Sequence, residues 1–242
     1  MGGRYALERG GIFFWIDGDI FGEYRAGAEI VEKGLAFVAP VQPSKIMAIG
    51  LNYKDHAAEM KKKLPDEPLV FMKPASSVTG PDKPIGIPAW AGRIDHEAEM
   101  AVVIGKRASR VSASTAMDYV LGVTCLNDVT ARELQTKDVQ YTRAKGFDTF
   151  APIGPCIAVG LDPGNLTIEG WVNDEKRQSS NTNQLIFPVR ELVAFVTRFC
   201  TLEPGDIITT GTPSGVGPLH VGDRVMVKVE GVGALSNPCV EA

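Results

Sequence analysis

The sequence has no long hydrophobic run and no excess of positive charge. Its longest apolar stretches, such as residues 12–16 and 100–104, are far shorter than the roughly 20 residues that span a bilayer. We therefore expect no membrane partner. The 25 lysines and arginines are outnumbered by 29 aspartates and glutamates, for a net charge of -4. This balance argues against nucleic acid as a partner, because nucleic-acid-binding surfaces are basic.

Cysteine and histidine are scarce, with four and three residues in a chain of 242. The cysteines lie far apart and form no C-x-x-C pair, which favours free thiols in a reducing compartment over a disulfide framework. The first residues carry no apolar signal core, so the sequence predicts a cytoplasmic location. A G-x-S-x-G elbow is missing as well, and the glycine-rich residues 211–217 lack the lysine of a phosphate-binding loop.

Glycine and proline are plentiful, with 26 and 16 residues. This composition is typical of a strand-rich fold with many turns and few long helices. Apolar runs or alternating patterns predict strands over residues 12–16, 20–24, 46–50, 97–104, 119–126, 207–210 and 225–229. The sequence therefore predicts a β-rich α+β fold rather than an alternating β-α one.

Helices are expected in three places. The polar residues 52–63 suit a helix with Asn52 as its N-cap, and residues 188–199 have apolar side chains at helical spacing. A short helix is predicted to begin at Thr130, because Thr130 and Glu133 match a capping box.

Two prolines within residues 39–43 suggest a linker after a small β unit. We therefore predict a small N-terminal β domain over residues 1–42 and a main domain over residues 43–242.

Three carboxylates form the most informative pattern. Glu97 and Glu99 lie two apart at the head of an apolar strand, so they face the same side. Such a pair is costly near a core unless cations compensate it, and the alternative is a strand start that faces solvent. Asp128 follows a second apolar strand. Three carboxylates without a converging histidine favour Mg²⁺, with Mn²⁺ as the alternative; His96 points to the opposite face, which argues against zinc.

Two pairs of polar residues lie three apart on predicted helices. His56 and Glu59 match a general base whose glutamate orients the imidazole, and Arg132 and Gln135 match a grip for a substrate carboxylate. The alternative for both pairs is an ordinary solvated helix face. Charged residues 61–63 and a proline-rich segment follow the first pair, which suggests a mobile lid.

Two lysines stand in apolar or aromatic company, Lys73 and Lys145. A partly buried lysine usually pairs with acids, and three acids are available here. Either lysine could also contact an oxyanion of a substrate.

Six segments together match one family, in that family's order. They are residues 50–56, 71–74, 96–105, 127–132, 145–150 and 211–217. The chain resembles the fumarylacetoacetate hydrolase family, in the shorter bacterial branch of acylpyruvate hydrolases and hydroxyheptadienedioate isomerases. The resemblance covers roughly residues 44–240, and the first ~40 residues resemble the small N-terminal domain of many bacterial members.

This resemblance implies a mixed β-sandwich roll that assembles as a homodimer. It implies the following roles: Mg²⁺ ligands Glu97, Glu99 and Asp128; catalytic residues His56, Glu59 and Lys145; substrate contacts Arg132, Gln135, Thr212 and Lys73. One departure is Gly146, where many members have serine, and a glycine is expected to loosen the turn that carries Lys145.

The resemblance also implies a reaction. A Mg²⁺-dependent hydrolase would cleave the C–C bond of a 2,4-dioxo acid (an acylpyruvate) through a metal-chelated pyruvate enolate. The alternatives on the same site are an isomerase of the 2-hydroxyhepta-2,4-diene-1,7-dioate type and an oxaloacetate decarboxylase. A further alternative, from a different class, is a metal-binding module without turnover.

Overall fold

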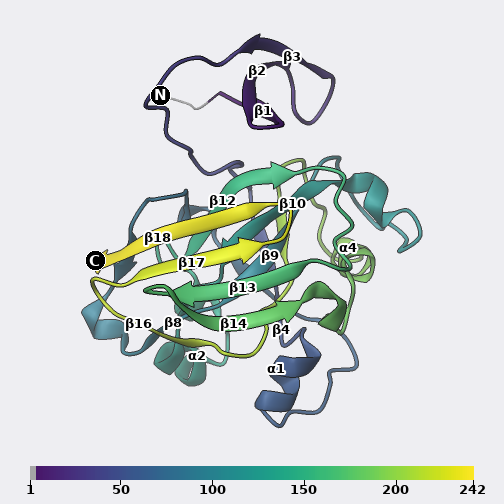
Figure 1. Cartoon of the computed structure of the whole chain (residues 1–242). Helices are drawn as coiled ribbons and strands as arrows, with labels where there is room; N and C mark the ends of the chain where they lie inside the picture. The colour runs from purple at the N-terminus through teal and green to yellow at the C-terminus, as the bar shows by residue number, and fades with distance from the viewer. Residues whose placement is uncertain (1–3) are drawn as a thin grey trace.

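The computed structural model describes residues 4–242, and strands make up most of its regular structure (Figure 1). The largest sheet has seven strands in the order β5 (Leu69–Lys73), β4 (Ile46–Gly50), β15 (Ile207–Thr209), β9 (Ala98–Ile104), β10 (Val120–Asn127), β12 (Ala151–Ala158) and β6 (Val78–Thr79). Two of its pairings, β15 with β4 and β12 with β6, are parallel and the others are antiparallel. The sheet is therefore mixed, as the sequence predicts.

A second sheet has five strands and lies against the first (Figure 1). Its order is β14 (Glu175–Asn181), β13 (Thr167–Val172), β17 (Arg224–Val229), β18 (Gly233–Glu241) and β7 (Ile85–Ile87). A small sheet of β11 (Thr130–Ala131), β8 (Ile94–His96) and β16 (Gly217–Leu219) flanks the two. The strand-rich α+β prediction is confirmed.

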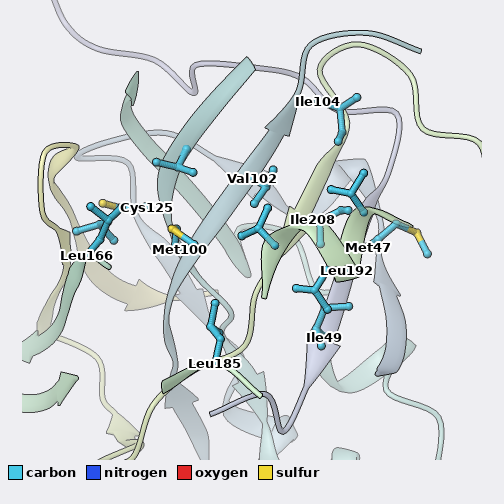
Figure 2. Close-up of a cluster of buried hydrophobic side chains, with 14 of the residues drawn as sticks. Met47, Ile49, Met100, Val102, Ile104, Cys125, Leu166, Leu185, Leu192 and Ile208 are labelled. Atoms are coloured by element: carbon cyan, nitrogen blue, oxygen red, sulfur yellow. The ribbon is translucent and has the colours of Figure 1, made fainter. Parts of the chain in front are cut away.

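The main core lies between the two large sheets. Every residue of β9 is buried, which explains its apolar run over residues 100–104, whereas β17 buries only Val225, Val227 and Val229 of its alternating sequence. Figure 2 shows part of this core, where Met100 and Val102 of β9 lie among Ile208, Leu185 and Leu192.

Helices are short and few. They are α1 (Lys54–Glu59), α2 (Arg132–Asp138), α3 (Thr142–Lys145), α4 (Val189–Thr197) and the 3₁₀ turns η1 (Ala75–Ser77), η2 (Ala89–Ala91), η3 (Ala116–Tyr119) and η4 (Thr182–Gln184). Among the described residues, no helix has the length and hydrophobicity needed to cross a bilayer.

Strands β1 (Ala6–Arg9), β2 (Ile12–Gly18) and β3 (Tyr24–Glu29) form a separate small sheet near the N-terminus (Figure 1). The predicted return strand exists as β3, which pairs antiparallel with β2, but its predicted bounds of residues 20–24 are wrong. Residues 19–22 instead form a turn in which Gly22 N–H donates to Asp19 O at 2.9 Å. Phe21 of this turn packs against the core cluster that contains Val41 and Ile207. The division of the chain at residue 42 stays a prediction.

Two predicted helix starts are wrong for the same physical reason. Asn52 does not cap α1, whose N-cap is Tyr53. Its amide instead donates to Phe187 O (3.1 Å) and Thr210 O (2.9 Å) and accepts from Phe187 N–H (2.8 Å). Thr130 lies in β11, and its hydroxyl donates to Asp128 O at 2.9 Å. In both cases, partners distant in sequence or a strand pairing replace the local cap.

Helix α4 attaches to the core through an apolar stripe, and Leu192 in it is fully buried. We expect Leu192→Ala to lower the free energy of unfolding by about 2–5 kcal/mol, because the truncation leaves a cavity. Arg190→Ala on the exposed side of the same helix should change it by less than about 0.5 kcal/mol. Urea denaturation measures both, and equal losses in the two variants would contradict this packing.

Candidate functional site

Three buried carboxylates meet where the end of β10 lies beside the start of β9. Glu97 lies between β8 and β9, Glu99 is the second residue of β9, and Asp128 follows β10. The pairing of Asn127 with Ala98, and the hydrogen bond from Asp128 N–H to Glu97 O at 2.9 Å, fix this junction. Each residue offers a carboxylate oxygen, and these three oxygens all lie within 4.8 Å of one another.

Buried cations surround two of the three acids. The Lys145 ammonium lies 2.9 Å from Glu97 Oε2 and 2.5 Å from Asp128 Oδ2, while Lys73 lies 2.5 Å from Asp128 Oδ1. Burial raises the pKa of Glu97, but the charges of Lys145 and Arg132 outweigh it and lower the pKa to about 2. Burial lowers the pKa of Lys145, yet Asp128 and Glu97 raise it overall, so this lysine is held charged.

Glu99 differs from its two neighbours. Among the described residues, no cation lies within ion-pair distance of it. Its Oε2 instead accepts hydrogen bonds from the Thr209 hydroxyl and from Gly211 N–H at 2.9 Å. Burial, and then the charges of Asp128 and Glu97, raise the pKa of Glu99 well above its usual range.

This donor set fits a hard divalent cation. Three carboxylate oxygens are the ligands that Mg²⁺ and Mn²⁺ prefer, and they converge within one small volume. A buried carboxylate without a cationic partner is costly, and Glu99 is such a group. A divalent ion would supply the missing positive charge at Glu99, while Lys145 and Lys73 would remain partners of Glu97 and Asp128.

His56 and Glu59 of α1 form the predicted pair. His56 Nδ1 lies 3.0 Å from Glu59 Oε2, and Gly215 N–H donates to Glu59 Oε1 at 3.2 Å. A carboxylate only accepts hydrogen bonds, so Nδ1 carries the proton and Nε2 is left as the acceptor. The loop of residues 211–217 thus contacts both this pair and, through Gly211, the carboxylate of Glu99.

The remaining predicted residues are the four expected substrate contacts. Arg132 and Gln135 share one face of α2, with Arg132 Nη1–H donating to Gln135 Oε1 at 2.8 Å, and Arg132 Nη2 lies 2.6 Å from Glu97 Oε1. The Thr212 hydroxyl donates to Ala98 O, the backbone carbonyl between Glu97 and Glu99, at 2.9 Å. Lys73 is fully buried and contacts Asp128 and the Val129 carbonyl. These contacts favour charge compensation over substrate binding for Lys73.

Gly146 turns out to be tightly packed. A Cβ at this position would lie 2.3 Å from Thr142 O and 3.1 Å from Pro74 Cδ. The glycine therefore permits a close approach of α3 to the segment after β5. The expected loosening of the turn is not what the structure has, and Lys145 is held between two carboxylates.

Sequence reasoning missed several residues of this network. Asp95 accepts from Arg132 Nε–H at 2.8 Å and from Arg93, and thereby fixes the guanidinium. Thr209 and Asn127 are the other two: Thr209 donates to Glu99, and Asn127 Oδ1 accepts from Glu97 N–H at 3.0 Å. Asp95 could have been suspected from its place directly before His96 and Glu97, whereas the other two residues carry no such signal.

Lys73 is one of two buried ammonium groups that contact Asp128, so its removal leaves the acidic cluster with one fewer compensating charge. We expect Lys73→Met, assayed without divalent cations, to lower the free energy of unfolding by about 3–5 kcal/mol. Lys176→Met removes an exposed partner of Glu169 and should cost at most about 1 kcal/mol. Thermal and urea unfolding in EDTA measure both, and a Lys73→Met variant as stable as wild type would contradict the described ion pair.

The fold and the buried acidic cluster describe a strand-rich α+β protein with a candidate site for a divalent metal ion. The family described as Fumarylacetoacetate (FAA) hydrolase C-terminal matches residues 45–240. The chain belongs to this family.

Relatives of known activity catalyse different reactions. The chain is 44% identical to the mitochondrial oxaloacetate tautomerase fahd2 of Xenopus laevis over 86% of this chain and 69% of that protein. It is 40% identical, with a TM-score of 0.91, to 5-carboxymethyl-2-hydroxymuconate delta-isomerase of Mycobacterium smegmatis, covering 99% of this chain and 94% of that one. Maleylpyruvate hydrolase of Sphingobium sp. SYK-6, solved with manganese(II) and pyruvate, is 34% identical with a TM-score of 0.78 over 89% of this chain and 77% of that one.

Proposed function

We propose that the protein is a Mg²⁺- or Mn²⁺-dependent hydrolase that cleaves acylpyruvates into a carboxylic acid and pyruvate. The observation that carries this proposal is the His56–Glu59 pair, which the loop of residues 211–217 joins to the buried three-carboxylate cluster through Gly215 and Gly211. Support comes from the relative in the same family that was solved with manganese(II) and pyruvate. All members named above act on small organic acids with oxo or enol groups, which agrees with a shared site.

In this proposal Glu97, Glu99 and Asp128 hold the divalent ion. When bound, the ion would supply Lewis-acid stabilisation of negative charge on the oxygens of a 2-oxo acid. Arg132 and Gln135 orient the substrate carboxylate, because a guanidinium and an amide present several donors to it. Thr212 lies on the loop that faces the same carboxylates through Gly211 and contributes a further contact.

His56 and Glu59 would activate water. Glu59 fixes the imidazole through Nδ1, so Nε2 takes a proton from water as it attacks the C4 carbonyl. The C3–C4 bond then breaks, C4 leaves as a carboxylic acid, and the proton held by His56 is available for C3 of pyruvate. Lys145 keeps a fixed positive charge beside the site and stabilises developing negative charge.

A second candidate reaction is proton transfer without an attacking water. It is favoured by the identity to the Xenopus tautomerase and to the mycobacterial isomerase. Such a reaction needs the same ion and the same grip on a carboxylate, but it uses His56 only to move a proton between carbon and oxygen.

Product analysis by NMR separates these reactions. The protein is incubated with acetylpyruvate, with oxaloacetate and with 2-hydroxyhepta-2,4-diene-1,7-dioate, each with Mg²⁺ and with EDTA. We expect acetate and pyruvate from acetylpyruvate only with Mg²⁺. Enol-to-keto conversion or diene isomerisation, with acetylpyruvate left intact, would favour proton transfer without an attacking water. Release of carbon dioxide from oxaloacetate would indicate a decarboxylase. Assembly as a homodimer stays a prediction that sedimentation can test.

A further inference from the structure

Gln178 of β14 is a buried amide behind the acidic cluster, and the proposed chemistry does not use it. Its side chain is 1% exposed, whereas its neighbours Arg177 and Ser179 are exposed. A buried amide is costly unless its hydrogen bonds are made. Both positions of the amide oxygen and both hydrogens of the amide nitrogen have partners.

The amide oxygen holds the strand on both sides of Glu97. It accepts from Ala98 N–H at 2.9 Å and lies 3.1 Å from His96 Nδ1. Because an amide oxygen only accepts, His96 carries its proton on Nδ1. Gln178 is therefore bonded to the residue before Glu97 and to the residue after it.

The amide nitrogen holds the glycine-rich loop. It donates to Thr212 Oγ1 and to Pro213 O, both at 2.8 Å. The Thr212 hydroxyl in turn donates a hydrogen bond to Ala98 O at 2.9 Å. Gln178, Thr212 and Ala98 thus form a closed ring of hydrogen bonds. This ring joins the start of β9, where Ala98 lies between Glu97 and Glu99, to the loop of residues 211–217.

The loop has further contacts that matter for the proposed chemistry. Gly211 N–H donates to Glu99, and Gly215 N–H donates to Glu59. The loop also packs tightly on β14, since a Cβ at Gly215 would lie 2.0 Å from Arg177 O. A shift of this loop would therefore displace Thr212 and loosen the His56–Glu59 pair together.

The acids keep most of their contacts without Gln178. Lys145 and Arg132 hold Glu97, Lys73 and Lys145 hold Asp128, and Thr209 holds Glu99, which also accepts from Gly211 N–H at the start of the loop. Losing Gln178 should leave the contacts of the two lysines, Arg132 and Thr209 in place while it releases residues 212–217.

We propose that Gln178 is a positioning residue that sets the loop of residues 211–217, and with it Thr212, against the three carboxylates. That the loop contacts a bound organic acid rests on the proposed function. That Gln178 holds the loop in place rests on the hydrogen bonds alone. It predicts that cation binding and organic-acid binding respond differently when Gln178 is changed.

Gln178→Glu is the sharpest variant. A carboxylate of the same length can still accept from Ala98 and His96, but it cannot donate to Pro213 O. Gln178→Met removes both halves of the network, and Ser179→Ala, exposed on the same strand, is the matched control. Mn²⁺ affinity is measured by electron paramagnetic resonance of the free ion, and oxalate affinity by calorimetry at saturating Mn²⁺.

In Gln178→Glu we expect Mn²⁺ affinity within threefold of wild type and oxalate affinity at least tenfold weaker, with Ser179→Ala unchanged in both. Gln178→Met should show the same split. Oxalate affinity within threefold of wild type in Gln178→Glu would overturn the proposal, and so would an equal loss of Mn²⁺ and oxalate affinity. If Gln178→Met does not fold, the glutamate variant decides.

A second measurement needs no ligand and separates this inference from the proposed function. Amide hydrogen exchange of residues 211–217 should be at least tenfold faster in Gln178→Glu than in wild type or Ser179→Ala. Unchanged exchange would overturn the positioning role. Wild-type protein that binds neither Mn²⁺ nor oxalate would instead contradict the proposed function, while the exchange result would still decide the role of Gln178.

Discussion

Glu99→Ala is expected to lower kcat for acetylpyruvate cleavage by about a thousandfold and to abolish the response to Mg²⁺. Glu99 is the acid without a cationic partner among the described residues, so its carboxylate is the one that most needs a divalent ion. Lewis-acid stabilisation contributes several kcal/mol to such reactions, and about 4 kcal/mol corresponds to three orders of magnitude in rate. Steady-state kinetics over a Mg²⁺ titration measure the effect.

Two further variants make the result specific. Glu99→Gln keeps the size of the side chain and should be nearly as inactive, because a neutral amide is a poor ligand for Mg²⁺. Glu191→Ala removes an exposed glutamate of α4 and should match wild type. Activity retained in Glu99→Ala with an undiminished Mg²⁺ response would rule out the three-carboxylate cluster as the active site.

His56→Ala is expected to lower the rate of acylpyruvate cleavage by about 10²–10⁴-fold, the usual contribution of a general base. The imidazole is the group that Glu59 orients, and its loss leaves α1 without an imidazole to accept the proton of water. Any oxaloacetate decarboxylation should fall much less, since that reaction needs no attacking water. His220→Ala is the matched control, because this histidine lies exposed on a loop outside the network.

The rates of cleavage and of decarboxylation in His56→Ala together identify the role of His56. A steep fall in cleavage with little change in decarboxylation assigns His56 to water activation. Wild-type rates for both reactions in His56→Ala would mean that His56 has no catalytic role. Equal losses in both would indicate proton transfer as its role and favour the isomerase or tautomerase reading.

The sequence predicted six of the eighteen strands in the described part of the chain, mainly those in which burial leaves a direct mark on composition. The apolar run of β9 over residues 100–104 and the alternation in β17 come from the number of faces that each strand buries. Asn52 and Thr130 were assigned as helix caps because both types are common there, yet their hydrogen bonds go elsewhere. The partners of Asn52 lie more than a hundred residues away, and Thr130 pairs in a strand with Asp95, so a local pattern shows neither.

The candidate site was predictable only in part. The spacing of Glu97 and Glu99 places them on one face, but their approach to Asp128 depends on the register of β9 with β10, and spacing does not give that register. The resemblance to a family supplied this link. Gln178 stood in the polar run of β14, where nothing separates a buried amide from its exposed neighbours.

The central claim is that the three-carboxylate cluster binds a divalent ion together with a 2-oxo acid. The most direct test is the melting temperature with Mg²⁺, with oxalate, and with both, in wild type and in Glu99→Ala. We expect oxalate to raise the melting temperature of wild type only when Mg²⁺ is present, because binding to the native state stabilises it, and we expect no such rise in Glu99→Ala. The same oxalate shift in EDTA, or an undiminished shift in Glu99→Ala, would contradict it.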